Sequence, residues 1–343
     1  MNDMKKILVG FLILTALLCS CGKTEQKNKF SAHSFDYFDT VTVITGYADS
    51  REEFDEISAF ILDELAQYHR LYTIYHRFEG LENLCALNAS ASDTPQAVTV
   101  DGRIVDMLVF AKKVYELSDG TVNVAMGSVL SLWHDYRTVG TELPPMDRLV
   151  SASEHTDIQK LIIDEENCTV ALSDAKMRLD VGALAKGYAV ERIARELSER
   201  GVEGYVLNVG GNVRTIGQKP SGEGFIVGIE NPQNTDGEYL AYLELRGESV
   251  VTSGSYQRYY TVDGERYHHI IDPQTLMPAK GYLSVSVICN DSGLGDALST
   301  ALFCMSVEQG LDILEMVPGA EALWVCDDGT KIYSPGFDRY TKK

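Results

Sequence analysis

The sequence is poor in the patterns that build zinc sites and disulfide frameworks. It has no C-x-x-C pair, and apart from Cys19 and Cys21 its cysteines are odd in number, namely Cys85, Cys168, Cys289, Cys304 and Cys326. Structural zinc sites need closely spaced ligands, and disulfide frameworks use even sets of cysteines. We therefore expect neither. Most of these cysteines should be buried and packed like apolar residues, and the alternative is that two of them form a single disulfide.

Basic residues are scarce relative to acidic ones. The chain has 30 Lys and Arg against 50 Asp and Glu, which gives a formal net charge of −20. An acidic surface repels the phosphate backbone of nucleic acids, so we expect no nucleic-acid partner. A phosphate-bearing ligand would have to be held by local devices, such as a metal, backbone amides or one well-placed lysine.

Long apolar runs are absent except at the start of the chain. There, Lys5 and Lys6 precede an uncharged run over residues 7–19, which is too short to span a bilayer and is typical of a signal peptide. Leu18-Cys19-Ser20-Cys21 resembles a bacterial lipobox, with Cys21 as the lipidated residue. The alternative is an ordinary secretory signal with two incidental cysteines. The lipobox predicts an exported protein, anchored by Cys21 to a bacterial membrane on its periplasmic or extracellular face.

Internal repeats and Pro/Gly/Ser-rich linkers are also missing. Residues 22–34 are polar and rich in lysine, without apolar periodicity, and this predicts a flexible tether. The rest is long enough for one full core. We therefore predict a signal peptide over 1–20, a tether with the lipidated Cys21 over 21–34, and one folded body over 35–343.

The body itself shows interspersed helix and strand patterns. Apolar residues at helical spacing predict helices over 51–71, 104–117, 183–200, 295–305 and 307–316. Strands are predicted at 41–47, around residues 161, 170 and 179, and at 205–209, 225–229, 239–245, 249–252, 267–271, 283–288 and in a final hairpin at 322–333. Without strict β-α-β alternation, the pattern predicts an α+β fold, a single compact body with mixed or antiparallel sheets and flanking helices.

One segment has the pattern of an anion site. Residues 179–188 (LDVGALAKGY) predict a strand that runs through glycine into the first turn of a helix. Such a junction leaves several amides unpaired and suits a pyrophosphate, and Lys186 would add a charge. The alternative is a plain turn with a surface lysine, because the segment matches neither a Walker loop nor G-x-G-x-x-G.

A second segment has the pattern of a hard-cation site. Asp296 and Thr300 are four residues apart in a predicted helix and therefore share a face. A carboxylate and a hydroxyl there suit Mg²⁺, with waters and phosphate oxygens as further ligands. The alternative is that Asp296 caps the helix and Thr300 packs in the interior.

A third segment offers a proton acceptor. His268 and His269 are adjacent in a predicted strand, so they point to opposite sides and only one faces a given site. A histidine of near-neutral pKa can take the proton of a hydroxyl nucleophile. A structural histidine is the alternative. Two weaker elements are residues 209–212 (VGGN) and residues 120–133, which either line a pocket or form simple turns.

Together and in this order, these segments resemble the ApbE family, the FAD:protein FMN transferases. The resemblance extends over residues 38–337, and its strings are AKGYAV (185–190), NVGGN (208–212), VTSGSYQRYY (251–260), HHIIDP (268–273) and DALSTALF (296–303). It implies an ApbE-like fold with FAD as substrate and Mg²⁺ as cofactor. It also implies acceptor proteins, namely exported or membrane redox complexes.

The resemblance also implies site residues. The metal ligands would be the backbone carbonyl of Ala183 and the side chains of Asp296 and Thr300, and His269 would be the catalytic base. The role of His268 is left open. Contacts to the flavin nucleotide would come from Phe38, Tyr75, Asn123, Val124, Ala125, Asp180, Lys186 and Ile270.

Two departures from the family pattern fall among these contacts. The first motif usually reads Met-Gly-Thr and here reads Phe38-Asp39-Thr40, while Asn123 and Ala125 replace the usual Asp and Thr. The activity implied is transfer of FMN from FAD to a threonine hydroxyl, with release of AMP. The alternatives are hydrolysis of FAD to FMN and AMP on the same site, and a noncatalytic flavin-binding lipoprotein.

Overall fold

The structure, a computed structural model, describes residues 27–233 and 237–342. Its centre is an eight-stranded sheet in which every neighbouring pair is antiparallel. In spatial order its strands are β1 (Asn28–Ser34), β2 (Thr42–Ala48), β6 (Tyr205–Val209), β7 (Asn212–Ile216), β10 (Ser249–Gly254), β13 (Tyr282–Cys289), β14 (Glu321–Cys326) and β15 (Lys331–Tyr333). Three smaller sheets accompany it. The first has the strand order β3 (Val98–Thr99), β5 (Thr169–Leu172), β4 (Leu161–Asp164). The second is the pair β8 (Phe225–Glu230) and β9 (Tyr239–Leu245), and the third is the pair β11 (Tyr259–Val262) and β12 (Glu265–His268).

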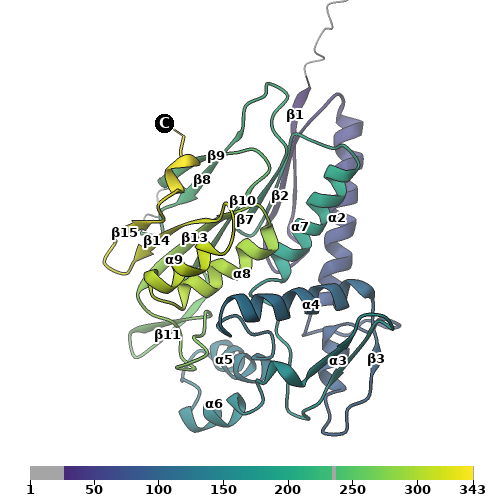
Figure 1. Ribbon diagram of the computed structural model, residues 1–343, viewed down its shortest axis with the longest axis vertical. Coiled ribbons are helices and arrows are strands. Elements are labelled where there is room, and N and C mark those ends of the chain that lie inside the picture. The colour runs from purple at the N-terminus through teal and green to yellow at the C-terminus, as the bar shows by residue number, and fades with distance from the viewer. Residues whose placement is uncertain (1–26, 234–236, 343) are drawn as a thin grey trace, which may run out of the picture.

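Helices cover one face of the large sheet and build the region below it (Figure 1). Among the covering helices, α2 (Arg51–Tyr72) contacts β2 and α7 (Ala185–Glu199) contacts β7. Helix α8 (Ser292–Phe303) contacts both β10 and β13, and α9 (Val307–Glu315) contacts α8 and β14. The lower region holds α3 (Leu84–Ala89), α4 (Gly102–Leu117), α5 (Gly127–Val139) and α6 (Met146–Ser153), and two short 3-10 helices are η1 (Ile158–Lys160) and η2 (Phe337–Arg339).

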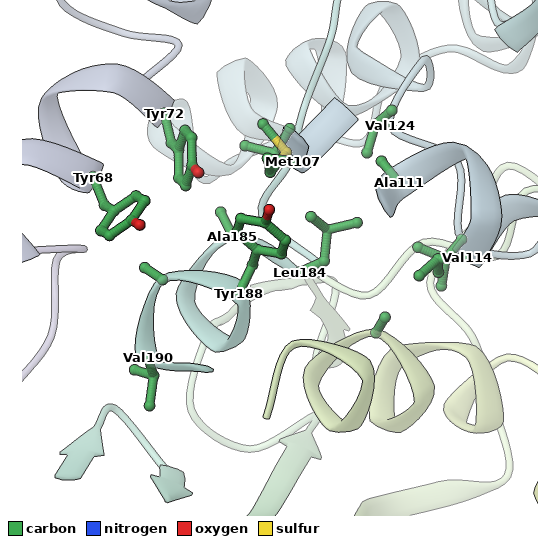
Figure 2. Close-up of a cluster of buried hydrophobic side chains, with 14 of the residues drawn as sticks. Tyr68, Tyr72, Met107, Ala111, Val114, Val124, Leu184, Ala185, Tyr188 and Val190 are labelled. Atoms are coloured by element: carbon green, nitrogen blue, oxygen red, sulfur yellow. The ribbon is translucent and has the colours of Figure 1, made fainter. Parts of the chain in front are cut away.

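The main hydrophobic core joins these two regions. Figure 2 shows its centre, where Tyr72 of α2, Met107 of α4 and Leu184 before α7 point toward one another. All three are at most 3 % exposed, and the ring of Tyr188 packs against that of Tyr72 at 6.4 Å between centroids. The start of α7 is therefore fixed by apolar packing, which holds the loop before it in place.

The predicted α+β class with antiparallel sheets and flanking helices is confirmed, and most predicted elements exist. The helix predicted over 51–71 is α2, with Ser50 accepting a hydrogen bond from the Glu53 amide as its N-cap. Asp101 caps α4, and Gly201 follows α7 with a φ of 77°. The hairpin predicted over 322–333 is the β14–β15 pair.

Two strand predictions were wrong. Around Leu179 only an isolated bridge forms, between Met126 and Arg178, because this segment is a connection and not a sheet member. The strand predicted over 267–271 ends at His268, so that His269 lies just beyond it.

The predicted tether is also wrong for residues 28–34. These residues form β1, which pairs with β2 in full register from Asn28 opposite Ala48 to Ser34 opposite Thr42. Apolar packing helps to explain why this strand forms, because Phe30 packs on Phe54 of α2 at 5.5 Å between ring centroids. The folded body therefore begins by Asn28 and not near Phe35. The signal-peptide and lipidation predictions for residues 1–21 lie outside the described residues.

The five cysteines within the described residues are all free, so the structure contains no disulfide among them. In the same part of the chain, no helix combines the length and the apolar character needed to cross a membrane.

Candidate active site

The site forms where the first turn of α7 crosses α8. Gly187, the third residue of α7, has no room for a side chain, because a Cβ there would lie 2.3 Å from the carbonyl oxygen of Ser292. On the other helix, a Cβ on Gly293 would lie 3.0 Å from the Cα of Tyr188. The two glycines let the helix backbones meet, and this contact brings Asp296 of α8 against the start of α7.

Asp296 is buried at this crossing, with its side chain only 7 % exposed. Its Oδ2 accepts a hydrogen bond from the Gly187 amide at 2.8 Å, and the Nζ of Lys186 lies 3.3 Å from its Oδ1. The N-cap of α8 is Asp291, whose side chain accepts from the Leu294 amide. The alternative that Asp296 is the helix cap is therefore wrong.

A group of hydroxyls continues the polar surface from Asp296. The Oγ1 of Thr300, one turn along α8, lies 3.4 Å from the Oγ of Ser253, and Ser253 lies 2.8 Å from the Oγ of Ser299. Thr300 also donates to the Asp296 carbonyl at 3.4 Å. The predicted pair of Asp296 and Thr300 is thus adjacent in space, and Ser253 of β10 adds a neighbouring oxygen.

The oxygen atoms of Asp296, Thr300 and Ser253 suit a hard divalent cation as ligands. The contact between Lys186 and Asp296 is longer than the about 2.7–2.9 Å typical of a charge-assisted N–H···O bond, so the carboxylate is only loosely compensated. Within the described residues no cluster of three or more His, Cys, Asp or Glu side chains could hold a metal. A cation here would therefore use one carboxylate with neutral oxygens, the set in which Mg²⁺ completes its shell with water and phosphate.

The junction before α7 is more fully hydrogen-bonded than the sequence predicted. The Gly182 amide donates to Asp180 Oδ1, the amides of Leu184 and Ala185 donate to the Val181 carbonyl, and the Gly187 amide donates to Asp296. The expected row of unpaired amides is therefore wrong for these four residues. Ala183 lies inside this turn, three residues before Lys186.

A cavity opens beside this junction. Four predicted nucleotide contacts line it, and the full lining is Phe38, Asp39, His69, Tyr72, Thr73, Ile74, Tyr75, Asp180, Val181, Gly182, Ala185, Lys186 and Arg258. Burial raises the pKa of the Asp180 carboxyl. Lys186 belongs both to this lining and to the contact with Asp296, so its side chain links the cavity to the candidate cation site.

The other four predicted contacts do not line this cavity. Val124 and Ala125 are at most 1 % exposed, and the Val124 carbonyl accepts from the Asp180 amide at 2.8 Å. Asn123 donates to the Thr156 carbonyl, while Ile270 is 5 % exposed in the main core. Val124 thus contacts the lining residue Asp180 through its backbone, whereas Asn123 is hydrogen-bonded to another segment and Ala125 and Ile270 lie in the core.

The lip of the cavity is strained backbone. Phe38 and Asp39 have φ values of 55° and 52°, a left-handed conformation that is uncommon outside glycine. The turn is fixed by His69, whose Nδ1 accepts from the Phe38 amide at 3.2 Å, and by Thr40 against Gly210, where a Cβ would meet Thr40 Oγ1 at 2.2 Å. The VGGN segment is therefore the tight turn between β6 and β7 that supports this lip.

His269 lies just after β12 and beside Arg258, whose side chain reaches the Asp39 carbonyl. Its Nδ1 is 3.2 Å from the carbonyl oxygen of Arg258, which only accepts, so Nδ1 carries the hydrogen and Nε2 keeps a lone pair. Burial first, and then the charge of Arg258, lowers the pKa of His269 to about 3. The imidazole is therefore neutral at pH 7 with its lone pair on Nε2, and a pKa this low makes it a weaker base in the free protein than the near-neutral histidine that the sequence predicts.

His268 has a structural role. Its Nε2 donates to the Ala279 carbonyl at 2.8 Å, and its Nδ1 accepts from the Ile270 amide at 3.2 Å. Its ring packs edge-on against Phe303 of α8, and burial lowers its pKa. Both nitrogens of His268 are satisfied, so it anchors the segment that presents His269.

The segment over residues 120–133 supports this hairpin from below. Trp133 of α5 is 3 % exposed and donates its indole N–H to the Leu276 carbonyl at 2.9 Å. Its ring packs near Tyr260 and Tyr267 of β11 and β12 at 6.5 Å between centroids. The predicted pocket wall is thus a small apolar cluster that holds the β11–β12 hairpin in place.

A buried ion pair fixes the opposite end of the helix crossing. Glu191 of α7 accepts from the Nε of Arg214 and from the Ser292 amide, both at 2.8 Å. Ser292 is the first residue of α8, and its hydroxyl contacts Asn212 Oδ1 at 2.5 Å. Although burial opposes ionisation, Arg214 holds the pKa of Glu191 below its usual 4.5. This network sets the position of α8, and so of Asp296.

Comparison with known proteins identifies the family. The model of the ApbE family matches residues 38–324. This chain belongs to the ApbE family. The chain is 33 % identical over 262 residues to the FAD:protein FMN transferase of Klebsiella pneumoniae, which covers 75 % of this chain and 81 % of that protein. It is 29 % identical over 333 residues to the protein of the same name from Treponema pallidum, with 92 % and 90 % covered.

Solved ApbE structures have the same fold. The crystal structure of the ApbE protein from Thermotoga maritima superimposes with a TM-score of 0.81 at 28 % identity, covering 92 % of this chain and all of that one. The flavin transferase ApbE from Vibrio cholerae gives a TM-score of 0.76 at 24 % identity, with 92 % and 99 % covered. The fold predicted from the resemblance is therefore confirmed.

The sequence predicts no role for three residues of this candidate site. His69 lies in the last turn of α2, where nothing in the pattern separates it from a surface histidine. Ser253 and Arg258 lie in the string over 251–260, which was singled out without assigning them a function. Only the folded chain shows that Ser253 meets Thr300 and that Arg258 reaches the cavity.

Proposed function

We propose that this protein is an Mg²⁺-dependent FAD:protein FMN transferase, which moves FMN from FAD to a threonine hydroxyl of an acceptor protein and releases AMP. The relatives named above are FAD:protein FMN transferases over most of the chain. The observation that supports the proposal most directly is the position of Lys186, which lines the cavity and also contacts Asp296. A nucleotide in the cavity would therefore bring its diphosphate to the candidate cation site.

The chain's own residues supply binding and proton transfer. Lys186 would bind a phosphate oxygen, and Phe38 and Tyr75 offer apolar surface at the cavity for the flavin ring. His269 would take the proton of the threonine hydroxyl at Nε2. The hydroxyl oxygen then forms a bond to the FMN-side phosphorus, the bond from that phosphorus to the bridging oxygen breaks, and its electron pair leaves with AMP.

Asp296, Thr300 and the Ala183 carbonyl would hold Mg²⁺. A bound Mg²⁺ supplies positive charge that stabilises the phosphate oxygens as the leaving group departs. Asn123, Val124, Ala125, Asp180 and Ile270 complete the proposed nucleotide site. Asp180 lines the cavity, and Val124 is hydrogen-bonded to the Asp180 amide. Precise positioning of FAD then supplies much of the remaining rate.

One reaction tests the proposal and its rivals. Purified protein is incubated with FAD, Mg²⁺ and a candidate acceptor domain, and the products are separated on a denaturing gel and by chromatography. We expect a fluorescent acceptor band and an equal amount of AMP. Free FMN without labelled acceptor would instead show hydrolysis, and intact FAD would show that the protein only binds flavin.

We also propose that the protein is exported and anchored to a bacterial membrane through lipidated Cys21, where its acceptors are exported or membrane redox complexes. Lys5, Lys6, the apolar run over 7–19 and the lipobox over 18–21 support this proposal. Cells fed an alkyne-labelled fatty acid should incorporate the label into the wild-type chain and not into Cys21→Ser. Label that persists in Cys21→Ser, or none in either protein, would contradict it.

A further inference from the structure

Arg258 is a cation at the cavity with most of its hydrogen-bonding capacity unused. Its guanidinium lines the cavity, and its one side-chain hydrogen bond among the described residues goes from Nη2 to the Asp39 carbonyl at 3.4 Å. None of the ion pairs within residues 27–233 and 237–342 includes it. A guanidinium has five N–H donors in a planar fork that suits a phosphate.

The surroundings make this cation unusual. The protein carries a net charge of −20, and the same cavity is lined by the carboxylates Asp39 and Asp180. The other cation in the lining, Lys186, is already shared with Asp296. A dianionic diphosphate entering the cavity would therefore find Arg258 as the lining cation that no carboxylate of the described chain engages.

The backbone of Arg258 is tied to His269. The Arg258 carbonyl accepts from the His269 amide and also from its Nδ1, both at 3.2 Å. One residue thus orients the imidazole through its carbonyl and places its guanidinium beside Asp39 of the cavity lining. An anion bound by that guanidinium would therefore lie within one arginine side chain of the carbonyl that orients His269.

We propose that Arg258 binds the diphosphate of FAD and holds the reacting phosphorus in register with His269. This inference rests on the proposed function, and it adds a second cationic contact opposite Lys186. Arg258 is then both a binding residue for the diphosphate and a positioning residue for the base. The affinity for riboflavin, which has no phosphate, should not depend on the guanidinium.

The test compares two ligands on the full chain in detergent. Binding of FAD and of riboflavin is measured by equilibrium dialysis with EDTA present, so that no metal-dependent turnover occurs. The variants are Arg258→Gln and Arg258→Lys, and the matched control is Arg266→Gln. Arg266 is an exposed cation of the same hairpin whose guanidinium lies over the Tyr259 ring at 4.8 Å, outside the cavity.

We expect Arg258→Gln to weaken FAD binding about tenfold, which corresponds to about 1.4 kcal/mol, and to leave riboflavin binding unchanged. Arg258→Lys should recover part of the FAD affinity, because it keeps the charge and loses the fork. Arg266→Gln should bind both ligands as the wild type does. With Mg²⁺ and acceptor at saturating FAD, kcat of Arg258→Gln should also fall, because the phosphorus is no longer held beside His269.

Two results would overturn the inference, namely FAD binding by Arg258→Gln equal to wild type, or equal losses of FAD and riboflavin. Both presuppose a wild type that binds FAD. Failure of the wild type to bind FAD or to label an acceptor would instead count against the proposed function. Because Arg258 is exposed, the variants should fold, and their melting temperatures check this.

Discussion

The amide of Gly187 donates to Asp296 Oδ2 at 2.8 Å, and the same glycine has no space for a side chain, since a Cβ would lie 2.5 Å from the Cβ of Asp296. The carboxylate is therefore positioned by the backbone of a neighbouring helix. We predict that Gly187→Ala pushes α7 from α8 and costs about 1–3 kcal/mol of unfolding free energy. FMN transfer should fall with it. Urea denaturation and the acceptor-labelling rate measure both effects.

The control for this prediction is Gly102→Ala at the start of α4. There the nearest atom to a new Cβ is Cys168 Sγ at 3.9 Å, an ordinary contact. This variant should keep its stability and its activity. Equal stability of Gly187→Ala and wild type would show that the helices tolerate separation, contrary to the structure.

Asp296→Asn separates the charge of the carboxylate from its hydrogen bond. The amide oxygen can still accept from the Gly187 amide, so the fold should be retained. Loss of the negative charge should raise the Mg²⁺ concentration that gives half-maximal transfer. Removing a residue that only hydrogen-bonds to a metal ligand weakens metal binding roughly 10- to 100-fold, and we expect a larger effect for a direct ligand. A Mg²⁺ titration of the transfer rate measures this. A titration curve identical to wild type would remove Asp296 from the cation site.

His269→Asn keeps the hydrogen bond to Arg258 and removes the base. The asparagine amide can donate to the carbonyl as Nδ1 does, but it has no counterpart of Nε2. Transfer should fall by about 10²–10⁴-fold while FAD still binds. Single-turnover rates and dialysis distinguish these two quantities. Retention of the wild-type rate would exclude His269 as the base.

The pH dependence of His269 follows from its burial. Its pKa is about 3 in the folded protein against 6.5 ordinarily, so the unfolded chain binds this proton first as pH falls. The contribution of His269 to stability is therefore retained above pH 6.5 and declines between pH 6.5 and about 3. NMR of the free protein should show a neutral imidazole at pH 5, assigned by its loss in His269→Asn. A midpoint near 6.5 would contradict the burial argument.

Removal of Glu191 should destabilise the protein through Arg214. Their side chains are 4 % and 11 % exposed, and truncation of one partner leaves a buried charge uncompensated. We expect Glu191→Ala to cost about 3–5 kcal/mol at pH 7. Because the pKa of Glu191 lies below 4.5, the wild-type advantage should be present above pH 4.5 and shrink below it. Urea midpoints of both proteins at pH 7 and at acid pH measure this.

A surface pair on the same helix provides the comparison. Glu196 contacts Arg200, and both side chains are about half exposed. Glu196→Ala should cost less than about 1 kcal/mol, because water screens the pair. If the two substitutions cost the same, the buried network has no special part in fixing α8.

The sequence was most informative where local chemistry decides the structure. The helices predicted over 51–71, 104–117 and 183–200 and the hairpin over 322–333 are confirmed. Ser50 caps the first of these helices and Asp101 the second, Gly201 follows the third with a positive φ, and all of these are short-range features. The Asp296 and Thr300 pair was predicted by helical spacing alone, and its proximity is confirmed.

Long-range contacts account for what was missed. Residues 28–34 have no apolar run, yet the backbone of β2 pairs with them and Phe54 packs on Phe30. The amides before α7 were expected to be free, but their acceptors, Val181 and Asp296, depend on the fold of the turn and on a helix more than a hundred residues later. No periodicity in the sequence encodes such partners.

Helix α2 separates the cavity from the N-terminal end of the described chain. Asn28 pairs with Ala48, beside the first turn of α2, whereas His69 and Tyr72 from its last turn line the cavity. Its 22 residues separate the two ends by about 33 Å. If Cys21 is lipidated as proposed, the transfer of FMN could take place up to this distance from the lipid headgroups. A suitable threonine would then stand on a projecting domain of its membrane complex.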